Sequence, residues 1–487
     1  MMCPTEQPAA PAIVFSAYAM WYAHGMETEA SVPSDKLDFK RVLPIFIIVL
    51  IDLLGLTIII PLLPLYATAF GANPFTIGLL GAAYPLMQFI GAPILGRLSD
   101  RYGRKPILII SQIGTLLGFI LLGFANALPI LFLSRIIDGL SGANIATAQA
   151  AISDVTTERN RTQGLGLIGA AFGLGFIIGP VIAFIALALS GNDYRVPAFA
   201  AAGFSLASIL LTTFWFKETL PEAQRGTSER RAGVSFSAMG AALRHPTIGL
   251  LLFLIFGQQI VFGGFEQLLS IFTLSRLGLN ASGNAVVFVF VGIILVAVQG
   301  GLVGRWSRAY GDRRLIFAGL ALLGVGLALI AFTPHQPPPW YSRAELEAEL
   351  NSPETDLSSE APTATNSTVA LPDDSNNGWF GLLWLLAGMI PVSIGGGMLQ
   401  PSINSLITKR IGLAEIGGML GISAAFLSAA NALAPVLGGA IFETVGPTAL
   451  FLIWGVVMGA LFLLAIRRLT PGREETAAPG LARGGGH

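Results

Sequence analysis

Four ionisable side chains lie inside long apolar stretches of the sequence, where burial is costly and makes them candidates for chemistry: Asp52, Arg135, Asp138 and Glu266. Asp52 is alone in its stretch and lies about ten residues from its start, or about 15 Å deep in a helix that rises about 1.5 Å per residue. A buried carboxylate resists ionisation, so it can take up and release a proton near neutral pH. We expect Asp52 to be the main proton-coupling residue.

The other three ionisable groups each have two interpretations. Arg135 and Asp138 are three residues apart, so on a helix they share a face and can form an ion pair. That pair is either structural, or Arg135 adjusts the charge of a nearby proton site. Glu266 lies about 28 Å along its own stretch by the same helical rise. It is therefore near the far side of the membrane, where it either relays protons or is simply solvated.

Polar uncharged residues in the apolar stretches are the next candidates. Such side chains either line a cavity or form hydrogen bonds between helices. A cavity with few fixed charges suits small, largely hydrophobic substrates. We expect the substrate cavity to be lined by members of one group of six residues: Tyr84, Gln88, Asn144, Gln259, Gln400 and Asn404.

The composition indicates which elements must position these residues. Only 11% of the 487 residues are charged and 53% are apolar, whereas soluble domains have about 25% and about 45–50%. Helices of about 20 apolar residues can cross a membrane because they satisfy their own backbone hydrogen bonds. We therefore predict an all-α polytopic membrane protein with twelve transmembrane helices, near residues 42–66, 75–95, 107–124, 128–151, 164–190, 196–216, 247–274, 285–304, 315–333, 379–406, 416–441 and 445–466.

The distribution of basic residues predicts the orientation. Of the 28 Lys and Arg residues, all but four fall in the tails and loops on the same side as the N-terminus. The exceptions are Arg195, Arg276 and Arg343 in the opposite loops and Arg135 within a span. Because basic residues accumulate on the cytoplasmic side, we expect both termini in the cytoplasm and a multi-pass protein of the plasma (inner) membrane.

A long connection and an internal repeat divide the chain. "GRWSRAYGDRR" at 304–314 repeats "GRLSDRYGRKP" at 96–106, 208 residues later, and Pro435 repeats Pro180, 255 residues later. Parallel repeats of six helices are typical of one transporter architecture. We expect two six-helix bundles joined by a cytoplasmic loop and flanked by cytoplasmic tails, with boundaries at 1–41, 42–216, 217–246, 247–466 and 467–487.

Residues 335–378 form a second long connection, on the outer side. This segment is rich in Pro, Ser and Thr, carries eight acidic residues and has little apolar content to bury. Its 44 residues nearly match the difference between the two repeat offsets, so it is predicted to be an insertion in the second half. We expect it to be disordered.

The charged stretch at 96–106 carries a family resemblance. It resembles the loop signature of the major facilitator superfamily and follows the second span as that signature does. "RIIDGLSGANIA" at 135–146 resembles the superfamily's fourth-span signature. The chain is similar, over residues 42–466, to the twelve-helix drug:proton antiporters that include the tetracycline exporters, which implies the major facilitator fold with two pseudo-symmetric bundles. The residues that match the loop signature are Gly96, Leu98, Asp100, Arg101, Gly103, Arg104 and Lys105.

The resemblance implies a gating role for this loop. Asp100 would face the N-terminus of span eleven, near Glu415 and Gly417, where the helix dipole favours an anion by about 0.3 to 1 kcal/mol. This latch would form when the cytoplasmic side closes. Gly96 and Gly103 would permit tight turning and close helix approach. The alternative is that the cations of the loop only enforce topology.

Span five also carries a signature. Gly175, Gly179 and Pro180 resemble the fifth-span pattern of antiporters, although Ala183 and Phe184 stand where that pattern continues with glycines. Small residues let helices approach closely in a membrane. We expect this span either to pack tightly or to form a flexible seam where the two halves move against each other.

Several classes of protein are excluded by what the sequence lacks. No G-x-x-x-x-G-K-[ST] loop occurs, so an ATP-driven pump is excluded. The predicted spans contain no His or Cys, so we expect no enzyme, metal site or cofactor, and no nucleic-acid partner. The leading hypothesis is proton-coupled antiport of small hydrophobic or drug-like molecules by a monomer in the lipid bilayer. Proton symport or uniport of a small nutrient or metabolite comes second, and a non-transporting membrane receptor is a distant third.

Overall fold

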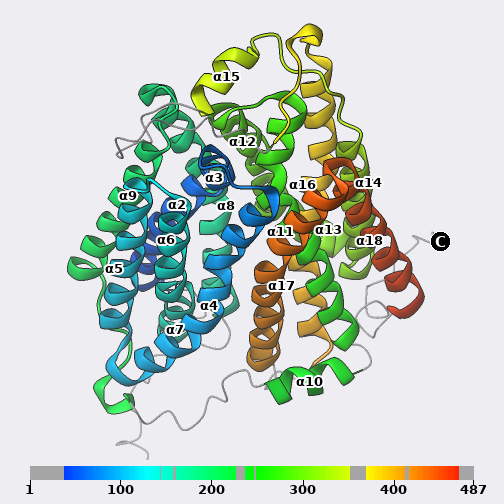
Figure 1. Ribbon diagram of the computed structural model, residues 1–487. Coiled ribbons are helices and arrows are strands. Elements are labelled where there is room, and N and C mark those ends of the chain that lie inside the picture. Colours follow the sequence, from blue (N-terminus) through cyan, green and yellow to red (C-terminus); the bar gives the residue numbers. More distant parts are fainter. Residues whose placement is uncertain are drawn as a thin grey trace, which may run out of the picture.

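The computed structural model describes residues 38–142, 144–156, 161–225, 236–245, 248–350, 369–411 and 416–470. Across these ranges every regular element is helical, and twelve helical segments are long and apolar enough to cross a membrane. The predicted all-α fold with twelve spans is therefore confirmed. Figure 1 shows the first six spans gathered on one side of the molecule and the last six on the other.

The first bundle, here called the N-half, has eight helices because two of its spans are interrupted. Span one bends between Ile59 and Leu63, where Pro61 cannot donate a backbone hydrogen bond, and Pro64 lies in the first turn of α3. Span four is interrupted after Ser141. The bounds are α2 Phe39–Ile59, α3 Leu63–Ala69, α4 Pro74–Tyr102, α5 Arg104–Gly123, α6 Leu128–Ser141, α7 Asn144–Val155, α8 Arg161–Ser190 and α9 Arg195–Phe214.

The second bundle, here called the C-half, is built alike. One of its spans runs from α12 through a π-helical turn, η2, into α13. Four short helices of the described ranges lie outside the spans: η1 Glu222–Gln224, α10 Phe236–Arg244, α15 Arg343–Leu350 and η4 Asp374–Asn376. The remaining bounds are α11 Ile248–Leu277, α12 Ala281–Ala297, η2 Val298–Leu302, α13 Val303–Tyr310, α14 Asp312–Ala331, α16 Phe380–Lys409, α17 Ile416–Val445 and α18 Pro447–Arg468.

The turn between the second and third spans is repeated in the two halves. Gly103 ends α4 with a φ of 105° and Gly311 ends α13 with a φ of 81°. Only glycine adopts this backbone region readily, so both positions need a residue without a side chain. We call the end of the molecule with these two turns and α10 the inner end, and the end with α15 the outer end; they lie at the bottom and top of Figure 1.

Ion pairs at the inner end are repeated with inverted charge. In the N-half, Arg104 at the start of α5 binds Asp154 of α7, with 2.9 Å between Nε and Oδ2. In the C-half, Asp312 at the start of α14 binds Lys409 of α16, with 2.6 Å between Oδ2 and Nζ. The two pairs occupy positions related by the repeat, since Lys409 follows Asp154 by the same 255 residues that separate Pro180 and Pro435. We call these two pairs the inner belt.

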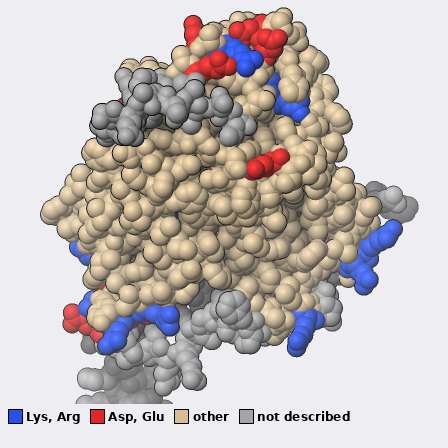
Figure 2. Space-filling model, viewed as in Figure 1, with Lys and Arg blue, Asp and Glu red and all other residues tan. Residues whose placement is uncertain are grey.

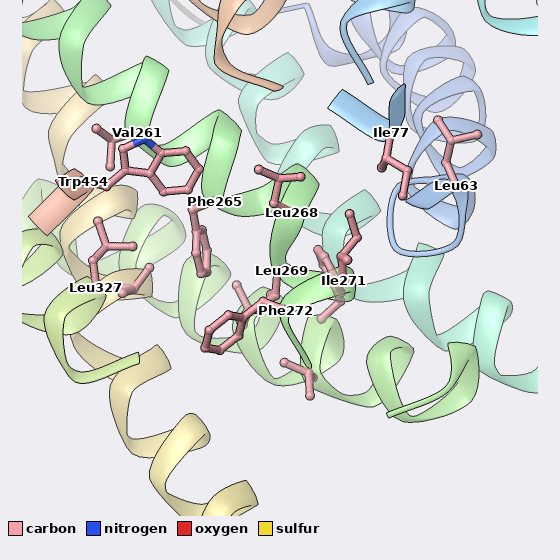
Figure 3. Packing of buried hydrophobic residues seen from close by; sticks show 14 of the residues in the cluster. Leu63, Ile77, Val261, Phe265, Leu268, Leu269, Ile271, Phe272, Leu327 and Trp454 are labelled. Atoms are coloured by element: carbon pink, nitrogen blue, oxygen red, sulfur yellow. The ribbon is translucent and has the colours of Figure 1, made fainter. Parts of the chain in front are cut away.

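Apolar packing in the C-half is densest around α11. The rings of Phe272 and Phe451 lie 4.4 Å apart, and the Phe265 ring packs edge-on against the same Phe451. A side chain at Gly264 would clash with the ring of Trp454, so glycine permits this close approach. Figure 3 shows Phe265, Phe272 and Trp454 beside aliphatic side chains of α11 such as Leu268 and Leu269. Helix α11 is therefore a rigid support for the polar residues it carries.

The two halves meet at the outer end. A Cβ atom at Gly78 of α4 would clash with the carbonyl oxygen of Pro435 in α17, so these helices are in backbone contact. The Glu443 carboxylate accepts hydrogen bonds of 3.0 Å from the Asn73 side chain and from the Phe75 backbone at the start of α4. Ser270 of α11 donates to the carbonyl oxygen of Pro61 at 2.9 Å.

Toward the inner end the same helices diverge, as Figure 1 shows for α4 and α17. A Cβ atom added at Gly96 of α4, Gly169 of α8 or Gly300 of η2 would have no neighbour within 4 Å. The described helices of the two halves are therefore in contact at the outer end and apart at the inner end, an arrangement that we call outer-closed and inner-open. Gly96 does not serve close helix approach in this conformation, which corrects the expectation for that residue.

The prediction of disorder for 335–378 is wrong for the described parts of that segment. Leu346 and Leu350 are spaced by four residues, so they share one face of α15, and both are buried. Tyr341 is also buried and donates to the carbonyl oxygen of Pro372 at 2.9 Å. These few apolar side chains suffice to fold the described parts of the segment because the outer end of the bundle offers them a surface.

Candidate substrate and proton-binding site

A polar pocket lies within the N-half, between α2, α4, α5, α6 and α7. Asp52 of α2 and Asn144 of α7 face each other across it, and Asn144 Nδ2 donates to both carboxylate oxygens at 3.0 and 2.9 Å. Asp52 is half-buried and Asn144 is buried. The pocket is lined by Asp52, Leu53, Leu56, Tyr84, Thr115, Phe119, Asp138, Gly142, Asn144 and Ile145.

The interruption of span four shapes this pocket. Helix α6 ends at Ser141, and the Gly142 carbonyl oxygen accepts a 2.8 Å hydrogen bond from Gln88 Nε2. The same Gln88 nitrogen lies 3.1 Å from the Tyr84 hydroxyl. A non-helical backbone is tolerated at membrane depth only where its polar groups find partners or line a cavity. The break therefore brings Asn144 to face Asp52.

Arg135 and Asp138 form a buried ion pair beside the same pocket. Arg135 Nη1 lies 3.2 Å from Asp138 Oδ2, and each side chain is only 2% exposed, which confirms the predicted pairing. The guanidinium also stacks over the Phe119 ring, with its central carbon 5.4 Å from the ring centroid. Arg135 Nη2 is buried without a hydrogen-bond partner among the described residues. The ion pair places two opposite charges next to Asp52, and their sum is close to zero.

The C-half presents amides on α11, α16 and α17. Gln259 Nε2 of α11 donates to Asn431 Oδ1 of α17 at 2.7 Å, and Ser423 donates to Asn404 Oδ1 at 2.9 Å. Gln400 is half-buried, and no hydrogen bond to its side chain occurs among the described residues. None of these three residues of the predicted cavity lines the pocket beside Asp52, whereas Tyr84 and Asn144 line it and Gln88 binds its Gly142 carbonyl oxygen.

Glu266 lies on α11, four residues before Ser270. It is half-buried on α11, and no described residue donates a hydrogen bond to its carboxylate. One helical turn further out, Ser270 makes its contact with Pro61 of the N-half. Glu266 thus lies just below the outer contact, as its predicted position near the far side indicated.

The signature loop forms a charge cluster within the N-half. Arg104 Nη1 lies 2.6 Å from Asp100 Oδ1 and also donates to Ser99, while its Nε holds Asp154 in the inner belt. Arg101 stacks on the ring of Tyr102 at the surface.

The predicted latch partner of Asp100 lies near Glu415, which is outside the described residues. Gly417 belongs to α17, but its surroundings are not among the described features. In this open conformation Asp100 binds Arg104 of its own loop. The latch stays a prediction.

The fifth-span glycines pack inside the N-half. A Cβ atom at Gly179 would clash with Thr57 of α2, and Gly175 faces the same residue. The contact between halves on this helix is made instead by Gly173, which faces Val296, and by Phe176, whose carbonyl oxygen touches Gly292 of α12. Gly175 and Gly179 therefore fit the tight-packing interpretation, and the seam between halves lies one helix face away.

Several residues of the pocket were not predicted. Thr115 and Phe119 of α5 line it, and Asn431 completes the amide pair of the C-half. Thr115 and Asn431 are polar residues within spans, the signal that identified Asn144. The sequence alone does not show which face of span three turns toward span one. Among the described residues, no group of three His, Cys, Asp or Glu residues could hold a metal ion.

Comparisons with known proteins agree on one family. A family model described as "Major Facilitator Superfamily" matches residues 45–343 and 371–484. The class B tetracycline resistance protein of Escherichia coli is 33% identical over 292 residues, covering 59% of this chain and 71% of that protein. The class C protein of Escherichia coli is 27% identical over 88% of this chain and 96% of its own length. Multidrug resistance protein 2 of Bacillus subtilis is 26% identical over 82% and 89%.

Solved structures share the fold. A D-xylose-proton symporter superposes with a TM-score of 0.66 at 15% identity, covering 89% of this chain and 98% of that one. The human organic anion transporter MFSD10 superposes with a TM-score of 0.61 at 21% identity, covering 89% of this chain and all of that one. At these identities the likeness shows the architecture and carries no statement about substrate.

Proposed function

The chain belongs to the major facilitator superfamily and is a secondary transporter of small molecules, and on that premise we propose that it exports drug-like compounds in exchange for protons. The observation that carries the proposal is the N-half pocket, where the Asp52 carboxylate faces a single amide donor and a nearly neutral ion pair. The relatives named for resistance to tetracycline and to multiple drugs support the choice of export.

Asp52 is the group that exchanges protons in this proposal. The two hydrogen bonds from Asn144 stabilise its ionised form, whereas the apolar residues Leu53 and Leu56 beside it favour the neutral form. Opposing influences on one carboxylate allow it to alternate between the two states. Because Arg135 neutralises Asp138, the pocket changes from negative to neutral when Asp52 takes a proton, and the affinity for substrate changes with it.

The open inner end supplies the route by which substrate arrives. Here the outer end is closed by the contacts of Gly78 and Glu443, so substrate reaches the pocket from the inner side. Export then requires the halves to rock so that the outer contacts separate. One charge moved through 100 mV supplies about 2.3 kcal/mol, enough for a roughly fifty-fold substrate gradient.

Orientation and assembly complete the proposal. The inner end faces the cytoplasm with both termini, because it carries exposed basic residues such as Arg97, Arg101 and Arg467. Figure 2 shows a broad middle band almost without charged side chains, with Lys and Arg along its lower edge. The protein is a monomer in the plasma (inner) membrane, since the pocket is complete within one chain.

Transport by purified protein in lipid vesicles tests this function. We expect an imposed pH gradient to drive tetracycline or ethidium against its concentration, with protons moving the opposite way and an uncoupler abolishing the effect. Empty vesicles are the control. Movement of protons and probe in the same direction would identify a symporter, flux that ignores the gradient would identify a uniporter, and either result would overturn the proposed exchange.

A further inference from the structure

The segment that contains α15 is additional to the family architecture. The family model matches up to residue 343 and resumes at 371, so all of α15 after Arg343 lies in the unmatched part. The N-half connects the equivalent spans by only the few residues between Gly123 and Leu128. The repeat and the transport cycle therefore do not account for α15.

The segment is nonetheless firmly docked on the outer end. Leu346 is 5% exposed and Leu350 is 7% exposed, and both belong to the main apolar cluster of the molecule. The Tyr341 ring packs against Gly278, which has a φ of 60° and where any Cβ atom would clash with that ring. Tyr341 thereby fixes the start of α15 to the end of α11.

Glu349 of α15 connects the two halves. Its Oε2 atom accepts a hydrogen bond of 3.2 Å from Asn192, between α8 and α9 of the N-half. The same oxygen accepts one of 3.1 Å from Asn280, at the start of α12 in the C-half. Ser282 of the C-half adds a 2.5 Å hydrogen bond to the Asn192 side chain. One half-buried carboxylate thus bridges groups that must separate when the outer end opens.

We propose that α15 is an outer clasp: through Glu349 it holds the 190–195 loop of the N-half against the start of α12, and it must release before the outer end can open. The inference rests on the proposed alternating access and orientation. The hydrogen bonds from Asn192 and Asn280 to Glu349 form only while these groups are held together at the outer end, so the clasp shifts the equilibrium toward the outer-closed state. It acts on the conformational equilibrium and touches neither the pocket nor Asp52.

The clasp should depend on external pH. Burial raises the pKa of Glu349, and the hydrogen bonds from Asn280 and Asn192 only partly oppose this. The facing titratable group is Tyr194, whose pKa is raised by burial and by the Glu349 charge, so it stays neutral. On α15 itself, Glu347 is paired with Arg343. A pKa higher in the clasped state than in the released state means that the clasp is tightest in acid and weakens as pH rises through the clasped pKa.

Cysteine accessibility tests the clasp without requiring transport. Ser270→Cys, in a protein with Cys3→Ser, places a thiol at a fully buried position of the outer contact. An impermeant maleimide added outside should label it about tenfold faster when Glu349→Ala is also present, because the outer-open state becomes more populated. Asn192→Ala should act in the same direction. Glu349→Gln mimics the protonated form of Glu349. With this substitution the Ser270→Cys thiol should label at every pH as slowly as it does in acid when Glu349 is present.

Two controls keep the outcome interpretable. Glu345→Ala removes an exposed acid from the same helix and should leave the labelling rate unchanged. Ser375→Cys is exposed in η4 and reports both the sidedness of the outer end and the intrinsic reaction rate at each pH. Labelling of Ser375→Cys only after lysis would reverse the orientation and so overturn part of the proposed function. If Ser375→Cys labels from outside and Glu349→Ala leaves the Ser270→Cys rate unchanged, the clasp is wrong.

Discussion

The two halves share one architecture but differ in the chemistry at their centres. The N-half encloses Asp52, Arg135 and Asp138 around a pocket, with an ion pair that is 2% exposed on both sides. The C-half carries the amide pair of Gln259 and Asn431 instead, and Glu266 has no hydrogen-bond donor among the described residues. In the proposed exchange, one half therefore carries the proton chemistry and the other supplies a neutral wall against which substrate can move.

The largest expected effect is a difference in proton coupling between the two half-buried carboxylates, Asp52 and Glu266. We expect Asp52→Asn to abolish uphill export while exchange of substrate down its gradient survives, because the pocket keeps its shape but loses its titrating group. Glu266→Gln should reduce coupling less completely, since Glu266 lies outside the pocket. Substrate-induced proton release from vesicles is the measurement. Normal proton release and normal concentration of substrate by Asp52→Asn would make Asp52 only a polar lining residue.

A second comparison concerns the buried ion pair and the equivalent position of the C-half. Asp138→Asn leaves the Arg135 charge buried without a counter-ion and should lower stability by about 3–5 kcal/mol. Ser393 follows Asp138 by 255 residues and is fully buried without a hydrogen-bond partner among the described residues. Ser393→Ala should therefore change stability by less than about 1 kcal/mol. Thermal unfolding in detergent measures both.

A double variant sharpens that test. Arg135→Leu combined with Asp138→Leu removes both charges and should recover most of the stability that Asp138→Asn loses. If the pair only stabilises the fold, this variant should transport normally. We expect it to transport poorly, because the pocket would no longer contain the paired charges that face Asp52. Normal coupling in the double variant would assign the pair a purely structural role.

The smallest expected effects lie in the inner belt. Arg104 is 3% exposed and binds Asp100, Asp154 and Ser99, so Arg104→Ala should cost about 2–3 kcal/mol. Lys409 is 45% exposed, so Lys409→Ala should cost about 1 kcal/mol or less. Arg101→Ala, which removes one exposed cation from the inner end, is the matched control. Equal losses in the two halves would show that the inverted pairs are energetically equivalent despite their different burial.

Local sequence patterns predicted the features that depend on local spacing. The twelve spans follow from hydropathy alone, and the pairing of Arg135 with Asp138 follows from a separation of three residues. The contact of Asp52 with Asn144 joins residues 92 positions apart and depends on where span four is interrupted. No local pattern contains that information.

The outer segment shows a second limit of the same kind. Its composition predicted disorder, because composition averages over many residues. Leu346 and Leu350 fold α15 only because the outer end of the bundle provides a surface for them. Whether such a surface exists is a property of the assembled fold and cannot be read from the segment itself.

The inverted charges of the inner belt also disfavour one kind of mispairing between the repeated halves. Two repeated halves could in principle exchange equivalent helices, with the third span of one half docking in the other. Such an exchange would bring Arg104 against Lys409 and Asp312 against Asp154, replacing two ion pairs by two like-charge contacts. Like charges in close contact cost several kcal/mol. The charge inversion therefore favours docking of each third span in its own half over docking in the other half.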